Sequence, residues 1–326
     1  MKAVLDSPVV KDPLLVEEVD SDRIDEVKLS TGGFLCLTGY WIFASDLFEA
    51  HHTQPDIAIF PDHYSLLQRF LGDEPQVQIM GNPGTVEALM VMAISISDHK
   101  GITAAAASAS DADGKSQYMS YHHLLTLVSA FHPNIRVRNA ATVLAGKVLQ
   151  ADPDHYDRLT ILEDLLENCM FASLQAQAVT WLKDELFVAY KASSSEGTAS
   201  ASSPFATSDA VEKVQYALFP ALGYLQDEST TIDDLKEYWL QNKEFHLKVA
   251  GFAMFLFGGE VGNEGQKGQS GHPGQTPDGM KAAVEERYVD PMLACVKRLE
   301  GAMEGDAEGI FELVLMKETL GKVPWH

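Results

Sequence analysis

The cysteines and histidines are the residues of this chain whose chemistry could support catalysis or metal binding. The three cysteines, Cys36, Cys169 and Cys295, are far apart and form no C-x-x-C pair. This spacing predicts neither a zinc site nor a disulfide framework, and it is typical of a reducing, intracellular compartment. The adjacent pairs His51-His52 and His122-His123 would point in different directions on a helix, so neither pair can hold a metal by itself. We therefore expect no metal site.

One of these thiols lies in an acidic neighbourhood. Cys169 follows Glu163, Asp164 and Glu167, and negative neighbours raise the pKa of a thiol and reduce its reactive thiolate fraction. A redox-sensing thiol and an inert buried thiol both remain open for Cys169. The side chain of His132 is expected to cap or fill a turn between two helices.

Motifs for nucleotide binding or hydrolysis are missing from the sequence. It contains no G-x-S-x-G, Walker A or H-E-x-x-H pattern, and each of these patterns would mark a specific catalytic geometry. The glycine-rich stretch 258–274 lacks the preceding strand and the following helix that a phosphate cradle needs. An enzyme built on carboxylates would need them clustered around a cavity, whereas the acids here are dispersed. We predict a protein that is not an enzyme and carries no cofactor.

The charge balance restricts the partners. The chain has 24 Lys and Arg against 47 Asp and Glu, a formal net charge of −23. Such acidity repels nucleic acid and anionic membranes, so we expect neither as a partner. It suits a protein with a basic face, although it can also serve only to keep a long surface soluble. The apolar run from Phe34 to Ser45 is too short to cross a bilayer and predicts a buried helix.

Charged residues at three places could contact a protein partner. The first is Asn134-Ile-Arg-Val-Arg138, in which Arg136 and Arg138 would either bind an acidic segment or pair with acids of the adjacent repeat. The second is the run Lys183, Asp184 and Glu185, which we expect to be exposed. The third is an acidic C-terminal face that contains Glu304, Glu308 and Glu312. For each place a solvated surface is the alternative.

The residues discussed above lie in or between segments whose apolar residues have helical spacing. Pro61-Asp62 and Asn82-Pro83 each resemble a helix start followed by apolar residues at helical intervals. No segment shows the alternation of a strand. The expected organisation is an acidic lead-in over 1–30, helical repeats over 31–192, a flexible insertion over 193–209, a further helical repeat over 210–257, a glycine-rich disordered loop over 258–278 and a terminal helical pair over 279–323.

A repeat is visible inside this organisation. Asn139-Ala-Ala-Thr-Val-Leu144 recurs thirty-eight residues later as Gln177-Ala-Val-Thr-Trp-Leu182, and the apolar residues ahead of each copy match at the same offset. Each copy is typical of two apolar helices separated by a short break. A period near forty residues made of two helices is the pattern of HEAT and armadillo repeats. The sequence therefore predicts an all-α fold, a HEAT/armadillo-like α-solenoid of helical hairpins with disordered loop insertions.

The two copies also carry a family resemblance. His132-Pro133, Arg136 to Leu149, Asp152-Pro153 and the segment ending in Ala-Val-Thr-Trp181-Leu-Lys-Asp-Glu185 resemble the fungal proteins that bind the AP-1-like (YAP) oxidative-stress transcription factor. That family includes a kinetochore-associated member and, more distantly, glomulin (Alf4). The match is best over about 118–191 and extends diffusely over about 30–320. Members are usually longer, and this chain is similar to their C-terminal part.

The resemblance implies a HEAT-like, non-enzymatic adaptor. Its relatives support peroxide-driven activation of a stress transcription factor, or cover the RING subunit of a cullin–RING ubiquitin ligase. It therefore implies a partner of one of these two kinds, met in the cytoplasm or the nucleus. The alternative is a kinetochore-associated structural component. The resemblance assigns no contact residue.

Overall fold

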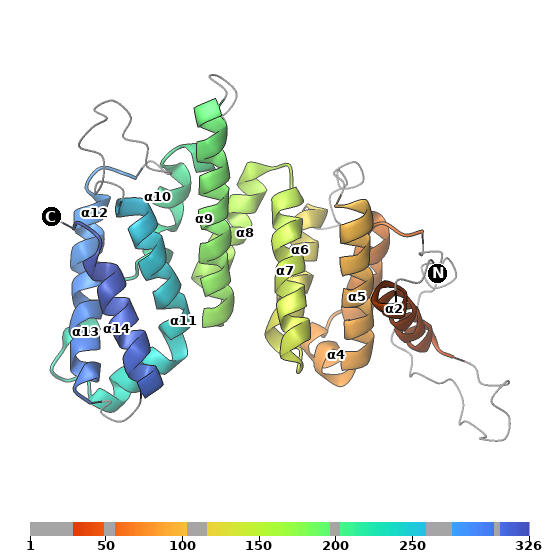
Figure 1. Ribbon diagram of the computed structural model, residues 1–326, viewed down its shortest axis with the longest axis horizontal. Helices are drawn as coiled ribbons and strands as arrows, with labels where there is room; N and C mark the ends of the chain where they lie inside the picture. Colours follow the sequence, from red (N-terminus) through yellow and green to blue (C-terminus); the bar gives the residue numbers. More distant parts are fainter. Residues whose placement is uncertain are drawn as a thin grey trace. The chain divides into compact units, whose positions relative to one another are not determined.

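The protein consists of two compact helical units. The computed structural model describes residues 29–48, 56–102, 116–195, 203–258, 276–302 and 307–325. The units are Met1–Pro153 and Asp154–His326. Every regular element among the described residues is a helix or a helical turn, as Figure 1 shows, so the predicted all-α class is confirmed.

Unit 1 is built both from helices adjacent in the chain and from helices that other elements separate in the chain. Its elements are α2 (Thr31–Leu47), the π-helical turn η2 (Ile59–His63), α3 (Tyr64–Leu71), α4 (Pro75–Gly81), α5 (Pro83–Lys100), α6 (Gln117–Phe131) and α7 (Ile135–Ala151). α2 packs on α5, and α6 pairs with α7. As the sequence predicts, α5 begins at Pro83 behind Asn82, a position where the missing N–H of proline costs nothing.

Unit 2 begins with a second hairpin and continues with further helices up to Gly321. Its elements are α8 (His155–Asn168), α9 (Ala172–Ser195), the 3-10 turn η4 (Pro204–Ala206), α10 (Asp209–Leu218), the 3-10 turn η5 (Gly223–Gln226), α11 (Ile232–Phe257), α12 (Met280–Val284), the π-helical turn η6 (Glu285–Val289), α13 (Asp290–Glu300) and α14 (Ala307–Gly321). α8 and α9 pack together, and α11 packs on both α9 and α14. Thr231 and Asp234 form a reciprocal capping box at the start of α11.

The two hairpins follow the thirty-eight-residue echo. α6 begins at Gln117 behind the cap Ser116, and α8 begins at His155 behind the cap Asp154, which is the same offset. Each cap side chain accepts a hydrogen bond from a first-turn amide. His132 fills the first turn as predicted, since its Nδ1 accepts from the Asn134 amide and its Nε2 contacts the Pro83 carbonyl oxygen.

The structure corrects two expectations about local order. The predicted flexible insertion over 193–209 is too long, because α9 continues to Ser195 and 203–209 are structured, with Phe205 fully buried. The serine-rich composition of this segment favoured flexibility, and it gave no indication that Phe205 would be buried. Residues 1–28, 196–202 and 259–275, which hold most of the expected lead-in and loops, lie outside the described residues.

The second correction concerns the buried helix predicted from the apolar run Phe34 to Ser45, which is α2. It ends at Leu47 and is buried on one side only, as described below. Across the described ranges no single helix has the length and apolarity to span a bilayer. Only α4 and α5 together pass that test of length and composition, and they are bent by 99° at their junction.

Candidate protein-binding surfaces

The predicted arginine pair lies at the start of α7. Arg136 is exposed, and Asn134 caps the helix by accepting a hydrogen bond from the Arg136 amide at 3.0 Å. Arg138 is half-buried, and its Nε is buried without a hydrogen-bond partner. Neither arginine forms an ion pair with another described residue. The helix start therefore presents one accessible guanidinium, Arg136, and one held partly inside the unit.

The run Lys183, Asp184 and Glu185 divides between surface and core. Lys183 and Asp184 are exposed, and the Lys183 ammonium lies 5.2 Å from the centre of the Phe255 ring. Glu185 is only 6% exposed, so the expectation of an exposed run is wrong for this residue. The reason is Arg158 of α8, whose guanidinium lies 3.0 Å from the Glu185 carboxylate.

This ion pair belongs to the interior of unit 2. Burial raises the pKa of the Glu185 carboxyl, with the charge of Arg158 opposing that shift and Asp184 adding to it. The Arg158 guanidinium also lies 5.9 Å from the Phe205 ring. Removing either member of a buried pair leaves an uncompensated charge. Glu185 therefore stabilises the α8–α9 hairpin and offers no surface to a partner.

The acidic C-terminal face is only partly visible. Glu304 lies outside the described residues, and the side chain of Glu308 is not described. Glu312 of α14 lies 2.8 Å from the Lys243 ammonium of α11, and Glu300 of α13 lies 2.9 Å from Lys317 of α14. The described acids are therefore already neutralised within unit 2.

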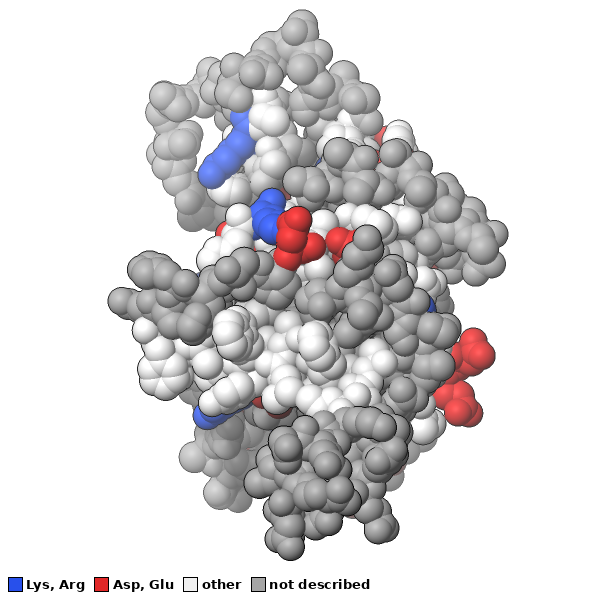
Figure 2. Space-filling view, turned by 90° about the vertical axis from the view of Figure 1, so that its right-hand side faces the viewer, with Lys and Arg blue, Asp and Glu red and all other residues white. Residues whose placement is uncertain are grey.

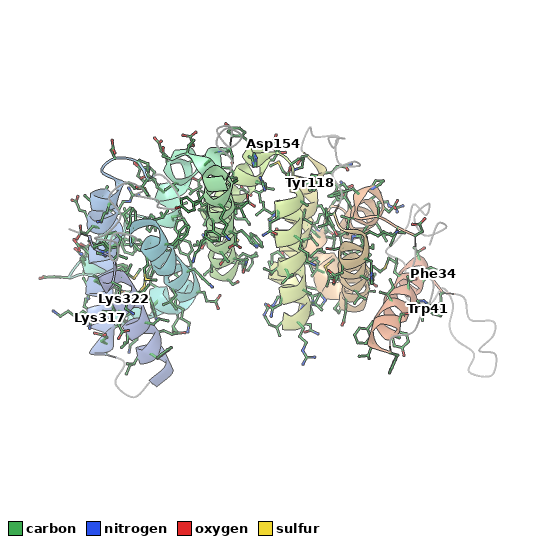
Figure 3. All side chains as sticks on the ribbon, turned by 45° about the horizontal axis from the view of Figure 1, so that its top comes forward. Phe34, Trp41, Tyr118, Asp154, Lys317 and Lys322 are labelled. Carbon is green, nitrogen blue, oxygen red and sulfur yellow. The ribbon has the colours of Figure 1, made fainter. Side chains whose placement is uncertain are left out.

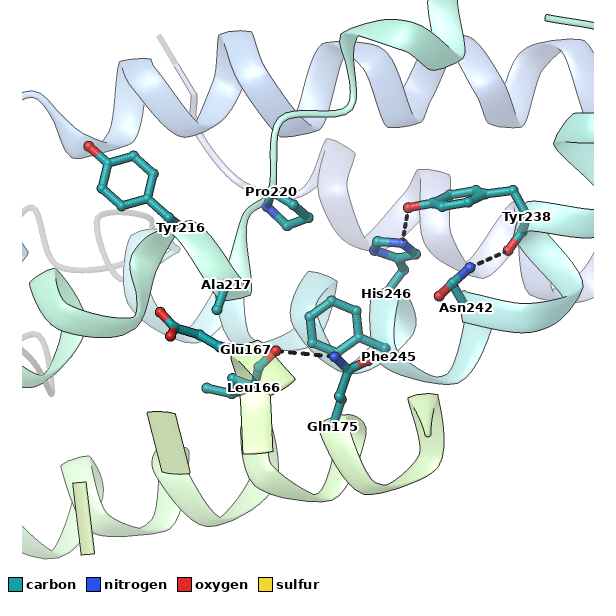
Figure 4. A pocket seen from close by; sticks show the side chains of 10 residues that line it. All are labelled: Leu166, Glu167, Gln175, Tyr216, Ala217, Pro220, Tyr238, Asn242, Phe245 and His246. Carbon is teal, nitrogen blue, oxygen red and sulfur yellow. Dashed lines mark hydrogen bonds between the residues drawn. The ribbon is translucent and has the colours of Figure 1, made fainter. Parts of the chain in front are cut away.

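A pocket of about 430 Å³ opens in unit 2, lined in part by His246 (Figure 4). The Nε2 of His246 lies 2.6 Å from the Tyr238 hydroxyl, and its Nδ1 lies 3.0 Å from the Tyr288 hydroxyl. Burial lowers the pKa of His246 to about 3, so the ring is neutral at physiological pH. The Gln175 and Asn242 amides donate to backbone carbonyl oxygens. His246, Tyr238, Gln175 and Asn242 thus form contacts within the fold.

The residues considered for metal or thiol chemistry are dispersed. Within the described ranges no three His, Cys, Asp or Glu side chains are placed to hold a metal ion. His122 is buried and His123 is exposed, as expected for neighbours on a helix, whereas His51 and His52 lie outside the described residues. The pKa of the Cys169 thiol is raised mainly by burial, with Asp164 adding to the shift. The predicted direction is therefore right, although burial is the larger cause.

The outer face of α2 is the feature that the sequence did not predict. Leu35 and Ile42 point into unit 1 and are fully buried. The opposite side of the helix, called here the α2 apolar face, is more than 40% exposed at each of the residues Phe34, Leu37, Tyr40, Trp41, Phe43, Leu47 and Phe48. Figure 3 labels Phe34 and Trp41 on it, and Figure 2 shows a patch of uncharged surface among the described residues at this end of unit 1.

A signal for this face was present in the sequence. Residues 31–45 contain no charged side chain, so the helix is apolar on all sides. Such a helix is normally covered all round, and exposed apolar patches of this kind mark interaction sites. The sequence shows the apolarity of the helix, but it does not show which side of the helix the other described residues cover.

A groove runs between α2 and α5 beside this face. Its volume is about 300 Å³ and it is lined by four residues of each helix. A Cβ atom at Gly39 would lie 2.8 Å from Ala88, so the two helices can approach closely only because residue 39 is glycine. Tyr40 and Phe43 of α2 and Val91 of α5 line the groove with apolar side chains, and Glu87 adds one carboxylate.

Comparison with known proteins gives a family for nearly the whole chain. Neither a search of curated proteins nor a search of solved structures found a match. A family model described as "Uncharacterised protein family, YAP/Alf4/glomulin" matches residues 9–321. The match includes both helical hairpins, the α2 apolar face and all the described helices. The chain belongs to the YAP/Alf4/glomulin family.

Proposed function

We propose that this protein is a non-enzymatic adaptor whose helical hairpins form a HEAT-like solenoid that binds other proteins. Membership in the YAP/Alf4/glomulin family supports a role in protein interaction. In such an architecture each hairpin packs only on its neighbours, and the array offers an extended surface for partners. The adaptor acts by masking a surface of one partner or by bringing two partners together.

The matched hairpins are the observation that carries this proposal. α6–α7 and α8–α9 start behind caps thirty-eight residues apart, and they bury matched leucines such as Leu144 and Leu182. Two helical units with one register are what a duplicated repeat would produce. This supports a repeat origin for the two hairpins, and repeat proteins of this kind serve mainly as binding scaffolds.

The pathway we propose comes from the family resemblance of the sequence. The partner is either a stress-responsive transcription factor of the AP-1-like type or the RING subunit of a cullin–RING ubiquitin ligase, met in the cytoplasm or the nucleus. Proposed contact residues are Arg136 and Arg138 at the start of α7, Lys183 and Asp184 of α9, and the C-terminal acids Glu304, Glu308 and Glu312. Of the three acids only Glu312 has a described side chain, and it would have to leave Lys243 to bind.

Affinity capture from cells with and without peroxide, followed by binding of the purified candidate to the purified chain, tests this function. Recovery of a stress transcription factor or a RING subunit that then binds directly is the expected result. Recovery of kinetochore proteins instead would favour the structural assembly role. Turnover of a small molecule by the purified chain, with no protein partner, would overturn the adaptor proposal.

A further inference from the structure

We propose that the groove between α2 and α5 binds an amphipathic helix of a partner protein, whose apolar side chains enter the groove while a Lys or Arg meets Glu87. This inference rests on the proposed adaptor function and assigns it a surface. Three observations carry it: the shape of the groove, its single charge, and the apolar face that continues beyond it.

The shape of the groove suits a helix. Its α2 side consists of Cys36, Gly39, Tyr40 and Phe43, and its α5 side of Gly84, Glu87, Ala88 and Val91. On both helices these residues follow the i, i+3, i+4, i+7 row of one face, a length of about two turns or 10 Å. Gly39 and Ala88 bring the two helices into contact at the floor of the groove, and the space around Gly84 is open. Helix-in-groove recognition uses an apolar stripe of the same spacing on the ligand.

The only charged side chain that lines the groove, Glu87, indicates that the partner carries a positive charge at this point. Glu87 is exposed and forms no ion pair with another described residue. A partner that covered this carboxylate without neutralising it would bury an unpaired charge, which is strongly unfavourable. A Lys or Arg beside the apolar stripe removes that cost. The net charge of −23 attracts a basic segment in the same sense.

The α2 apolar face extends the contact beyond the groove. Tyr40 and Phe43 belong both to the groove and to the α2 apolar face, and the exposed Leu47 continues their row by one helical turn. Aromatic side chains of this kind provide most of the binding free energy at protein interfaces. A partner helix seated in the groove can therefore bury aromatic surface as well as the groove itself.

Two other occupants fit the observations less well. A second copy of this chain would bring another net charge of −23 to the same contact, which opposes association. A membrane surface would press the Glu87 carboxylate into an apolar layer, and residues 31–45 include no Lys or Arg to meet anionic lipid. Both become outcomes of the experiment below.

The first test places a larger side chain at the lining of the groove. Gly84 lines the groove and nothing lies within 4 Å of a Cβ added there, so we use Gly84→Leu, with its circular dichroism spectrum and urea midpoint compared with those of the wild type. Gly81→Leu is the matched control, because Gly81 is equally open, lies at the end of α4 and does not line the groove. The probe is a fluorescein-labelled helical peptide of about fourteen residues, with leucines in one stripe, alanine and glutamine elsewhere and one lysine beside the stripe.

Fluorescence anisotropy with the full chain gives the affinities. We expect Gly84→Leu to weaken binding of the lysine peptide at least about tenfold, whereas Gly81→Leu leaves it unchanged. We also expect a matched peptide with glutamate in place of lysine to bind less tightly to the wild type. Glu87→Lys should reverse that preference. Equal binding to wild type and Gly84→Leu, or an unchanged preference in Glu87→Lys, would overturn the proposal.

Three further outcomes are separated by parallel measurements. Self-association of the wild type that Gly84→Leu abolishes would assign the groove to a second copy. Binding to phosphatidylserine vesicles that Gly84→Leu abolishes would assign it to a membrane. If no peptide binds but the chain still captures its cellular partner when Gly84→Leu is present, the groove inference fails and the adaptor function stands. If the chain captures no partner but the peptide data hold, the groove stands without the proposed pathway.

Discussion

The hairpins α6–α7 and α8–α9 share a register but differ in what they bury. Leu144 and Leu182, at matched positions, are both fully buried. The next residue toward the N-terminus differs, since Val143 is 62% exposed and Trp181 is 5% exposed. The repeat thus determines which leucines are buried in both hairpins. The burial of the neighbouring positions differs between the hairpins and depends on what each unit packs against them.

The charged positions show the same contrast. Lys147 corresponds to Glu185 at the offset of thirty-eight residues. Lys147 lies 2.6 Å from Asp98 with both side chains well exposed, whereas Glu185 is buried against Arg158. One register therefore carries an exposed ion pair in unit 1 and a buried one in unit 2. Because burial decides how much an ion pair contributes, equal-looking charges should have unequal effects on stability.

The largest expected difference is between Trp181→Ala and Val143→Ala. Removing the buried indole should lower the free energy of unfolding by about 3–5 kcal/mol, because the lost packing leaves a cavity. Removing the exposed valine side chain should change it by less than about 0.5 kcal/mol. Urea denaturation monitored by circular dichroism measures both. Equal losses of free energy of unfolding at the two positions would mean that residues 143 and 181 contribute equally to stability, against the difference in burial.

The next comparison breaks each ion pair. Arg158→Met keeps the apolar stem but leaves Glu185 buried without its cation, so we expect a loss of about 3 kcal/mol. Asp98→Asn should cost at most about 1 kcal/mol, because exposed pairs are weak. The Asp98 effect should also disappear at high salt, while the Arg158 effect should persist. A stable Arg158→Met variant would show that Glu185 finds another partner.

The pH dependence of stability sharpens the contrast further. Burial raises the pKa of Glu185 above its ordinary value of 4.5, so the folded state holds this proton more tightly than the unfolded state. The stabilisation from that proton is complete below pH 4.5 and is lost as the pH rises through the folded-state pKa. Glu185→Gln should remove this decline. The free energies of unfolding of the wild type and of Glu185→Gln, measured by urea denaturation at several pH values, give the difference. Identical pH profiles would contradict the assignment.

The smallest effects are expected at the helix caps, where the hairpins should behave alike. Ser116→Ala and Asp154→Ala each remove a side-chain acceptor for first-turn amides. We expect each to cost about 1 kcal/mol. Similar losses in urea denaturation would support a shared hairpin start. A cost at only one of the two caps would weaken the case for a common repeat.

Local sequence patterns were sufficient to predict the helical class and several helix starts. Asn82-Pro83 marks the start of α5, and α11 lies within the helical segment expected over 210–257. The row Leu174, Ala178, Leu182 and Leu186, spaced four residues apart, is buried. These features depend on residues within one or two helical turns, so periodicity and capping chemistry determine them.

The candidate surface was much less predictable. Arg136 and Asp184 are exposed, whereas Glu185 is buried because a distant residue, Arg158, meets it across the hairpin. Phe205 lies in a serine-rich segment whose composition favoured flexibility, but it is buried in unit 2. In each case the deciding contact joins residues far apart in the chain, and no local pattern records such a contact.

The sequence by itself determined the all-α class, the hairpin register and the acidic character of this protein. These follow from residue spacing and charge, which need no knowledge of neighbours. The tertiary structure alone decided which side of α2 is covered. A helix without charge from Thr31 to Ser45 is normally covered on all sides, and only the packing of α2 on α5 shows which side the described residues cover.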